Sequence, residues 1–232
     1  MVSMSEKPQR RHSEALKRKS LLSSRQDVKA NIDANIMACR KCPGLNLPGD
    51  TEAACGYGNL QSPIMLVGQS MHAYNPETPE RQIPFLNASW VEHAGLPLFQ
   101  ALEEAGIRFE DVFTTNVVHC HPPRNRPCTS QEAANCRQFL MREISLVRPR
   151  LVICLGMAAG EALDVPTRDR ICRLEIDEPA CKHTCWATLV LHPAYIVRVW
   201  KEDRDQYQVW ARYLAYLVDR FMLLGSKRKE PQ

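Results

Sequence analysis

Four cysteines in this chain have a spacing that is typical of metal ligands. Cys39 and Cys42 form a CxxC pair, and Cys120 and Cys136 follow sixteen positions apart around the Pro-rich stretch HPPRNRP. A local pair of thiolates and two further thiolates from another loop can complete a tetrahedral site for zinc or for an iron–sulfur cluster. The spacing alone leaves three alternatives open: zinc, an iron–sulfur cluster, or cysteines that are simply buried.

The remaining cysteines carry less information about metal binding. Cys154 lies within a strand-like apolar run, so we expect it in the core. The motif CKHTC, with one earlier cysteine, leaves open a second zinc site. That site would be formed by Cys172, Cys181, Cys185 and His183.

Composition restricts the class of protein. The 232 residues are 44% hydrophobic, which suits a folded domain, and the net charge of +4 permits nucleic-acid binding without demonstrating it. No apolar run approaches the roughly 18 residues that a membrane span needs. The basic N-terminus lacks the apolar run of a secretory signal, so we expect a cytoplasmic protein whose clustered cysteines are ligands and not disulfides.

Strand-like and helical patterns alternate along the chain. We expect helices over residues 24–38, Leu96–Ala105, Ser130–Val147, Met157–Leu163 and 204–224. The strand-like runs are Ile64–Val67, Val112–Val118, Leu151–Leu155 and Ala187–Leu191. This alternation predicts an α/β fold with three layers, α/β/α, around a central, mainly parallel four-stranded sheet. We expect a basic flexible arm at residues 1–23, one domain at 24–225 and a basic tail at 226–232.

Polar residues stand where the predicted strands end. In open α/β sheets, ligands bind beyond the carboxyl ends of the strands. Those ends are Gln69 and Ser70, Asn116, Gly156 and His192. Asparagine is unfavourable in strands, so its presence in an apolar run already indicates a function.

The order of several motifs resembles the iron–sulfur, family-four branch of the uracil-DNA glycosylases along most of residues 35–200. The motifs are CRKCPGL, GYGNLQSPIMLVGQS, IPF, TNVVHCHPPRNRP followed by a cysteine, LGMAAGEAL and LHPAYIVR. The resemblance implies a uracil-DNA glycosylase-like fold and a monomer that binds DNA. It also implies a [4Fe–4S] cluster near the DNA surface, with a structural role, held by Cys39, Cys42, Cys120 and Cys136.

The resemblance also implies roles in the base pocket. Phe85 would stack on the flipped pyrimidine, near Ser70, and the Asn116 carboxamide suits the N3–H and O4 of uracil. His192 would donate a hydrogen bond to O2 as charge builds on the departing base. The family's loop that enters the minor groove corresponds to Pro193 and Ala194.

Three arginines are candidates for phosphate contacts. Arg124 and Arg126 lie in the Pro-rich segment, and Arg198 follows the HPA tripeptide.

The chain also departs from the family pattern. Relatives carry GE-x-PG after the first strand, whereas this chain has GQSMH, so Gln69 stands where the family has a catalytic glutamate. The segment PFLNASWVEHAG is longer than its counterpart. Glu77 or Glu80 could replace the missing carboxylate, and His72 and His93 are further pocket candidates.

These observations favour a DNA glycosylase that hydrolyses the N-glycosidic bond of uracil, or of a related deaminated or modified base, and leaves an abasic site. The alternative is a non-catalytic protein of the same fold that binds a lesion or modified base, because glutamine cannot act as a base. An iron–sulfur redox protein would explain the cysteines but neither Asn116 nor His192.

Overall fold

A computed structural model of the chain describes residues 24–48, 51–70, 95–166, 168, 170–200 and 204–226. Several predictions fall outside these residues and stay predictions. They concern the arm at 1–23, most of the basic tail, and the segment 71–94, which contains His72, Glu77, Glu80, Phe85 and His93.

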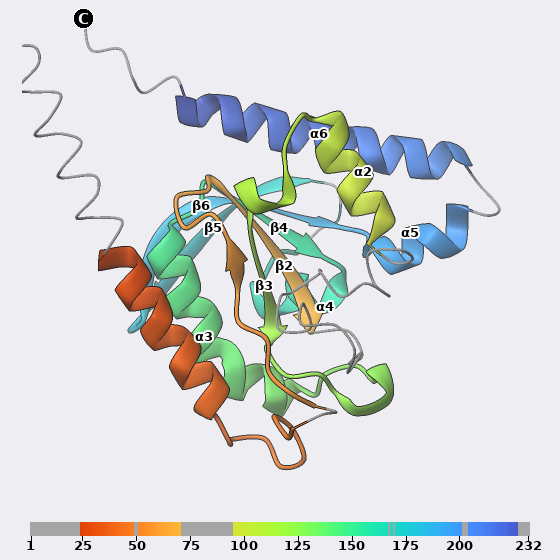
Figure 1. Cartoon of the computed structure of the whole chain (residues 1–232). Helices are drawn as coiled ribbons and strands as arrows, with labels where there is room; N and C mark the ends of the chain where they lie inside the picture. Colours follow the sequence, from red (N-terminus) through yellow and green to blue (C-terminus); the bar gives the residue numbers. More distant parts are fainter. Residues whose placement is uncertain are drawn as a thin grey trace, which may run out of the picture.

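One six-stranded sheet organises the described residues, in the order β1-β3-β2-β4-β6-β5 (Figure 1). The four central strands run parallel to one another, and the two outer strands are antiparallel to their neighbours. The bounds are β1 Tyr57–Gly58, β2 Ile64–Ser70, β3 Phe113–Val118, β4 Leu151–Leu155, β5 Ile171–Glu178 and β6 Cys181–Val190.

The four predicted strands are therefore confirmed as the parallel centre, but the predicted number of strands was too small. β1 has only two residues, too few for a periodic pattern. β5 pairs with Cys181–Thr188 of β6 in an antiparallel hairpin, and buried and exposed residues alternate along β5 and the start of β6. That hairpin lacks the continuous apolar run that identified the other strands.

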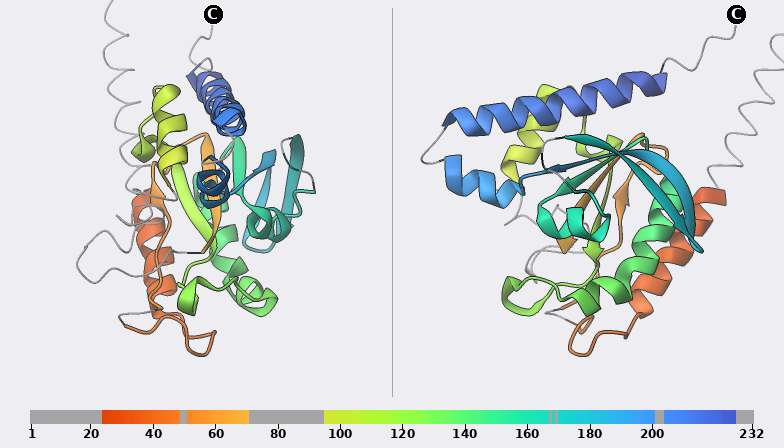
Figure 2. Two further views of the ribbon diagram at one scale, coloured as in Figure 1. Left: turned by 90° about the vertical axis from the view of Figure 1, so that its right-hand side faces the viewer. Right: turned by 180° about the vertical axis from the view of Figure 1, so that it is seen from behind.

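Helices cover both faces of the sheet, which confirms the three layers. The helix over residues 24–38 lies beside α3 (Ser130–Val147) on one face, together with α4 (Met157–Ala162) (Figures 1 and 2). The opposite face is covered by α2 (Leu96–Glu104), α5 (Pro193–Trp200) and α6 (Arg204–Ser226).

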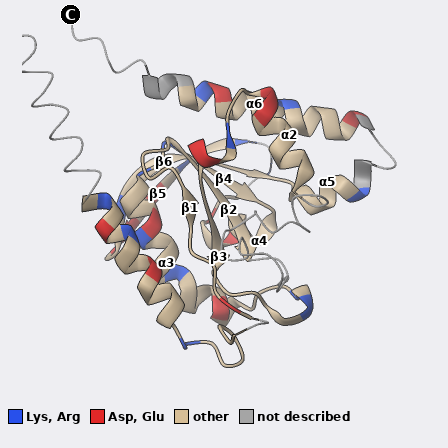
Figure 3. Cartoon of the chain, in the orientation of Figure 1, with Lys and Arg blue, Asp and Glu red and all other residues tan. Residues whose placement is uncertain are grey.

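Ile64–Val67 of β2 and all of β4 are apolar on both faces because helices cover each face, whereas β3 also buries Thr114, Thr115 and Asn116. In β2, Met65 and Val67 belong to the core under α3, whereas Ile64 and Leu66 belong to the core under α6. Successive side chains of a strand point to opposite faces, so a strand between two helical layers needs an unbroken apolar run. The described charged residues of α6 lie on the outer surface of that helix (Figure 3), whereas α3 also carries two buried carboxylates, Glu132 and Glu143.

A buried carboxylate ties α3 to the sheet. Glu143 is fully buried, and its Oε1 accepts a hydrogen bond from the Gly56 N–H at 3.0 Å. Its Oε2 accepts the Thr115 hydroxyl and lies 3.2 Å from His119 Nε2. Burial alone would raise the pKa of Glu143, but His119 and the hydrogen bonds outweigh burial and hold that pKa below its usual value.

The reciprocal effect acts on the imidazole of the same pair. Burial would lower the pKa of His119, but the adjacent Glu143 carboxylate raises it to about 10. The two groups therefore form a buried ion pair. Removing one partner of such a pair leaves an uncompensated charge, which is more costly than the net contribution of the intact pair.

We expect Glu143→Ala to lower the free energy of unfolding by about 3–5 kcal/mol, because it leaves His119, Thr115 and the Gly56 N–H without their acceptor. Urea unfolding followed by circular dichroism measures the change. Gln138→Ala, an exposed site on the same helix, is the matched control and should change stability by less than about 0.5 kcal/mol. Equal midpoints for the two variants would contradict a structural role for Glu143.

Candidate functional site

The carboxyl ends of the four parallel strands meet at one edge of the sheet. Asn116 of β3 is in register with Gly68 of β2, so Gln69 follows directly beside it. Gln69 and Ser70 are half-buried at the end of β2. Asn116, Gln69 and Ser70 therefore lie at the same edge of the sheet, as the strand-end rule predicted.

Asn116 carries an unpaired acceptor in the interior. Its side chain is 1% exposed, and its Oδ1 atom has no hydrogen-bond partner among the described residues. A buried polar atom without a partner costs roughly 1–3 kcal/mol. An unpaired acceptor near the carboxyl end of β3, two residues before the strand ends, is suited to a ligand that brings its own N–H.

His192 caps the amino end of α5. Its carbonyl accepts hydrogen bonds from the N–H groups of Tyr195 at 2.8 Å and Ile196 at 3.3 Å, and Pro193 opens the helix. The predicted loop at Pro193 and Ala194 is therefore wrong in its conformation: these residues form the first turn of α5. Proline at the first helical position is compatible with both structures, which is why the motif did not reveal the helix.

The same cap sets the tautomer of the imidazole. The Ala194 N–H donates to His192 Nδ1 at 3.1 Å, so a neutral ring carries its proton on Nε2. The side chain is half-buried. His192 can therefore present an N–H donor at this edge of the sheet.

Gly156, which follows β4, leaves room for the side chain of His192, which follows β6. The glycine has a φ of +89°, and a Cβ added there would lie 3.1 Å from the Cβ of His192. Its N–H donates to the carbonyl of Val190 at 2.9 Å, which holds the ends of β4 and β6 together. A larger residue here would strain the backbone and displace the imidazole.

The predicted phosphate-contacting arginines differ in their surroundings. Arg126 makes a two-pronged ion pair with Glu132, at 2.6 and 2.9 Å, and chiefly this bond lowers the pKa of Glu132 to about 2. Arg124 is exposed, and the Arg198 guanidinium lies 5.9 Å from the ring centroid of exposed Tyr195. The charge of Arg126 is thus largely offset within the protein.

The CxxC pair is fixed by a buried asparagine. Cys39 follows directly after the helix over residues 24–38. Asn46 Nδ2 donates to the carbonyls of Met37 and Cys39, both at 2.9 Å, and its Oδ1 accepts from the N–H of Ala53 at 3.1 Å. These bonds close the helix end and join it to the next segment.

The other two cysteines are joined to this turn. Ala53 forms an isolated antiparallel bridge with Cys120. From α3, Asn135 Nδ2 donates to Cys42 Sγ at 3.3 Å, and Cys136 is the next residue. Hydrogen bonds therefore bring together the three segments that carry the four predicted ligands.

The electrostatics of the thiols agree with this proximity. Burial raises the pKa of Cys120 to about 12, and the charges of Cys136, Cys39 and Cys42 add to the shift. Four thiolates would repel one another here unless a cationic metal centre compensated them, so the donor set fits such a centre. Nevertheless, no group of three or more potential ligands reaches metal-binding geometry among the residues that the structure describes.

The second cysteine group does not assemble either within the described part of the chain. Cys185 is buried in β6, and burial raises its pKa to about 12. The His183 ring donates to the carbonyl of Pro149 at 2.7 Å. These side chains are accounted for by packing and by backbone hydrogen bonding.

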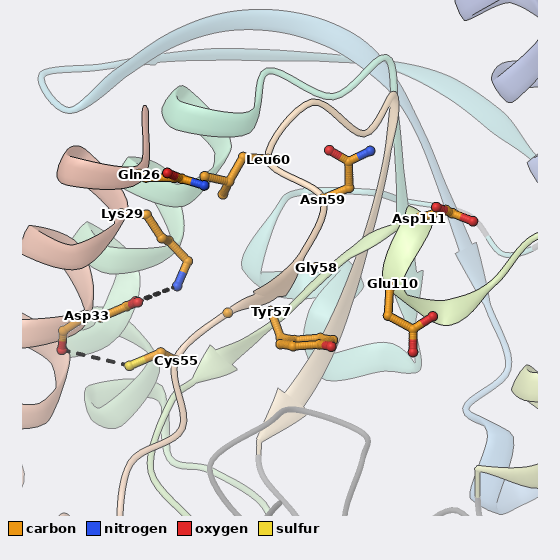
Figure 4. A pocket seen from close by; sticks show the side chains of 11 residues that line it. Gln26, Lys29, Asp33, Cys55, Tyr57, Gly58, Asn59, Leu60, Glu110 and Asp111 are labelled. Atoms are coloured by element: carbon orange, nitrogen blue, oxygen red, sulfur yellow. Dashed lines mark hydrogen bonds and ion pairs between the residues drawn. The ribbon is translucent and has the colours of Figure 1, made fainter. Parts of the chain in front are cut away.

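A cavity of about 670 Å³ lies away from the strand ends, between the helix over residues 24–38, β1 and the start of β3 (Figure 4). Lys29 in its wall pairs with Asp33 at 2.5 Å, and Glu110 and Asp111 line the far side. Its carboxylates would repel phosphate, so this cavity does not suit nucleic acid.

Sequence reasoning missed the residues that support the site. Asn46, Asn135 and Glu143 carry the bonds described above, yet none lies in a recognised motif. One signal was present: Glu143 falls seven residues after Cys136 on the same face of a helix, among apolar positions. An acidic residue on a buried helical face indicates a specific partner.

No helix among the described residues is long and apolar enough to cross a membrane.

A family model for the uracil DNA glycosylase superfamily matches residues 55–217. The chain belongs to this superfamily, which confirms the predicted fold and the resemblance.

The chain is also similar in sequence to individual curated proteins. The chain is 35% identical over 136 residues to a Type-4 uracil-DNA glycosylase of Thermotoga maritima, covering 59% of this chain and 66% of that protein. It is 35% identical over 131 residues to one of Archaeoglobus fulgidus, covering 56% and 61%. A Type-5 uracil-DNA glycosylase of Pyrobaculum aerophilum is 29% identical over 114 residues, covering 46% and 50%. The chain thus spans less than two thirds of the length of these relatives.

We expect Gly156→Ala to displace the His192 ring, because the new Cβ would meet the imidazole and the backbone would be strained. The ¹⁵N NMR signals of His192 report the change. Gly106→Ala is the matched control, since Gly106 also has a positive φ, of +67°, but has nothing within 4 Å of its added Cβ. Unchanged His192 signals in Gly156→Ala would refute the packing role of this glycine.

Proposed function

We propose that this chain is a DNA glycosylase that hydrolyses the N-glycosidic bond of uracil, or of a related deaminated base, flipped out of DNA. The observation that carries the proposal is the buried, unpartnered Oδ1 of Asn116 at the carboxyl edge of the sheet in a uracil DNA glycosylase superfamily fold. The curated relatives described above are all named uracil-DNA glycosylases, which supports catalysis over simple lesion binding.

Asn116 would select the base. Its Oδ1 accepts the N3–H of uracil and its Nδ2 donates to O4, which satisfies the buried carboxamide. Cytosine has no hydrogen on N3 to donate to Oδ1. It also presents an amino group in place of O4, so the Nδ2 donor of Asn116 would face another donor. A site built around buried hydrogen-bonding groups rejects analogues that leave those groups unpaired.

His192 would stabilise the departing base. As the bond between C1′ and N1 breaks, its electron pair moves onto the base and negative charge builds on O2. The Nε2–H that the Ala194 bond sets on the ring can donate there. The amino end of α5 adds a positive partial charge at the same place.

Gln69 would hold the attacking water. Water adds a hydroxyl group to C1′, and the proton that it loses ends on the base or in solvent. A carboxamide can orient water by hydrogen bonds but cannot accept its proton, and general-base help is typically worth 10²–10⁴-fold. We therefore infer that this protein excises the base more slowly than it would with a glutamate at position 69.

DNA would approach the carboxyl edge of the sheet. Arg124 and Arg198 are exposed and could contact phosphates, whereas Arg126 would first have to share its charge with Glu132. The first turn of α5, with Pro193 and Ala194, would enter the minor groove as a helical corner. We expect the chain to act as a monomer in the cytoplasm.

We also propose that Cys39, Cys42, Cys120 and Cys136 hold a [4Fe–4S] cluster, which supplies metal–thiolate bonds that join three segments of chain. The proximity of the thiols and the similarity to Type-4 proteins support this proposal. Small shifts of the segments described above would have to close the ligand set. The residues of the base pocket, and not the cluster, carry out the hydrolysis.

If the cluster is present, anaerobically purified protein should be brown, with broad absorption near about 400 nm and bound iron and sulfide. Cys42→Ser should lose iron and absorption. Cys172→Ser is the control, because this half-buried thiol of β5 lies outside the proposed ligand set and donates to the carbonyl of Ala187, and it should keep both. Stoichiometric zinc without iron would refute the assignment.

For the reaction, we expect wild-type protein to release uracil from an oligonucleotide and leave an alkali-labile abasic site. His192→Ala should slow single-turnover excision by about 10²–10³-fold with little loss of DNA binding, because it removes a donor used in the transition state. Gln69→Glu should accelerate excision by restoring a base, by up to about 10²–10⁴-fold. Gln138→Ala serves as the surface control.

Equal rates for wild type and His192→Ala would exclude the proposed role of the imidazole. Inactive wild-type protein with active Gln69→Glu would instead indicate a natural lesion binder with an intact uracil pocket. Inactivity of all variants on uracil would contradict uracil as the substrate and require tests on other deaminated bases.

A further inference from the structure

A second pocket, of about 530 Å³, lies at the opposite end of the sheet from Asn116 and His192. We call it the Arg–Trp pocket; its lining includes Arg148, Arg150, Arg173, His183, Trp186 and Phe221. Trp186 is paired with Leu151, the first residue of β4, whereas His192 follows the far end of β6. The length of β4 therefore separates this pocket from the base site, by roughly 15 Å.

The pocket is rigidly built. The connection between α3 and β4 is fastened to β6 by hydrogen bonds on both sides. The carbonyl of Pro149 accepts from His183 Nε2 at 2.7 Å, and the carbonyl of Arg150 accepts from the N–H of Trp186 at 2.8 Å. The two arginines that flank Pro149 thus stand at fixed positions beside the tryptophan.

The rim is strongly cationic. Arg148 and Arg173 are exposed and Arg150 is half-buried. Arg173 pairs with Glu175 at 2.9 Å, and the Arg148 guanidinium donates to the carbonyl of Lys182 at 3.3 Å. Arg148 also lines two neighbouring hollows, one with Arg150 and Asp111 and the other with Arg25 and Arg142. The positive surface therefore continues beyond the pocket. Such a surface suits a polyanion more than a single small anion.

Trp186 provides an open aromatic face on a rigid strand. Its side chain is 49% exposed, and it lies directly opposite Arg173 in the β5–β6 hairpin. Cross-strand neighbours are close enough to act on one ligand. Base stacking on an aromatic ring, with cationic side chains along the backbone, is the usual way in which proteins bind single-stranded nucleic acid.

We propose that the Arg–Trp pocket binds single-stranded nucleic acid, with one base stacked on Trp186 and the adjoining phosphates held by Arg148, Arg150 and Arg173. A duplex hides the faces of its bases, so the indole favours an unpaired strand. That this strand is DNA rests on the proposed function; the contact itself requires no excision. The distance from the strand ends makes it a second attachment, separate from the base pocket.

The test uses the full-length, metal-loaded protein and a labelled oligothymidine without uracil, with binding followed by fluorescence anisotropy. Trp186→Ala should weaken binding roughly 5- to 100-fold, and Trp186→Phe should restore most of it. Arg148→Ala with Arg150→Ala should weaken binding and reduce its dependence on salt. Tyr216→Ala, an equally exposed aromatic on α6, is the matched control and should bind as wild type. Thermal melts verify that each variant folds.

The outcomes separate this inference from the proposed activity. Weakened binding in Trp186→Ala supports the pocket even if no variant excises uracil. Wild-type affinity in both Trp186→Ala and the double arginine variant overturns it, even if excision is normal. The inference would also be overturned if Trp186→Ala and Tyr216→Ala weakened binding equally. The same holds if inorganic polyphosphate competed fully and Trp186→Ala had no effect, because binding would then be a nonspecific charge interaction.

Discussion

The buried carboxylate of Glu143 is the interaction on which the arrangement of both halves of the site depends. Thr115, which donates to it, is the neighbour of Asn116, and His119, which pairs with it, is the neighbour of Cys120. One side chain of α3 thus holds the strand that carries Asn116, the proposed base-reading residue, and the segment that carries a proposed cluster ligand. Neither side can shift without breaking a hydrogen bond in a low-dielectric interior.

The position of the Glu143 carboxylate also explains why residue 56 is a glycine. A Cβ at Gly56 would lie 2.5 Å from Glu143 Oε1 and 2.7 Å from the ring of Phe113. Only glycine allows its backbone N–H to reach the carboxylate. The segment from Gly56 to β1 is therefore bound to the same centre as α3 and β3, which explains why three elements distant in sequence form one rigid unit.

The sequence predicted those parts of the fold in which one physical constraint acts alone. Strands buried on both faces are rich in apolar residues, so β2 and β4 were predictable, and β3 was predicted although Thr114, Thr115 and Asn116 interrupt its apolar pattern. The range of α3 was predicted from its helical periodicity. The β5–β6 hairpin escaped because one of its faces is exposed, and α5 because its first turn coincides with a motif interpreted as a loop. The positions of Asn116 and His192 near the carboxyl ends of β3 and β6 were predictable from the apolar runs that precede them, and their roles stay predictions. The partners of Glu143 were not, because their proximity arises only from tertiary packing.

The outer strand of the sheet has a consequence for behaviour in concentrated solution. β5 is the edge strand of the described sheet, and an edge offers unpaired backbone groups to any other extended chain. Its exposed positions carry Arg173, Glu175 and Asp177, and all three are ion-paired: Arg173 with Glu175, and Asp177 with Lys182. A second copy of this edge would have to desolvate those charges before it could pair. The alternation of buried and exposed residues in β5 thus disfavours aggregation through this edge, and the same alternation is the reason that the apolar-run criterion missed the strand.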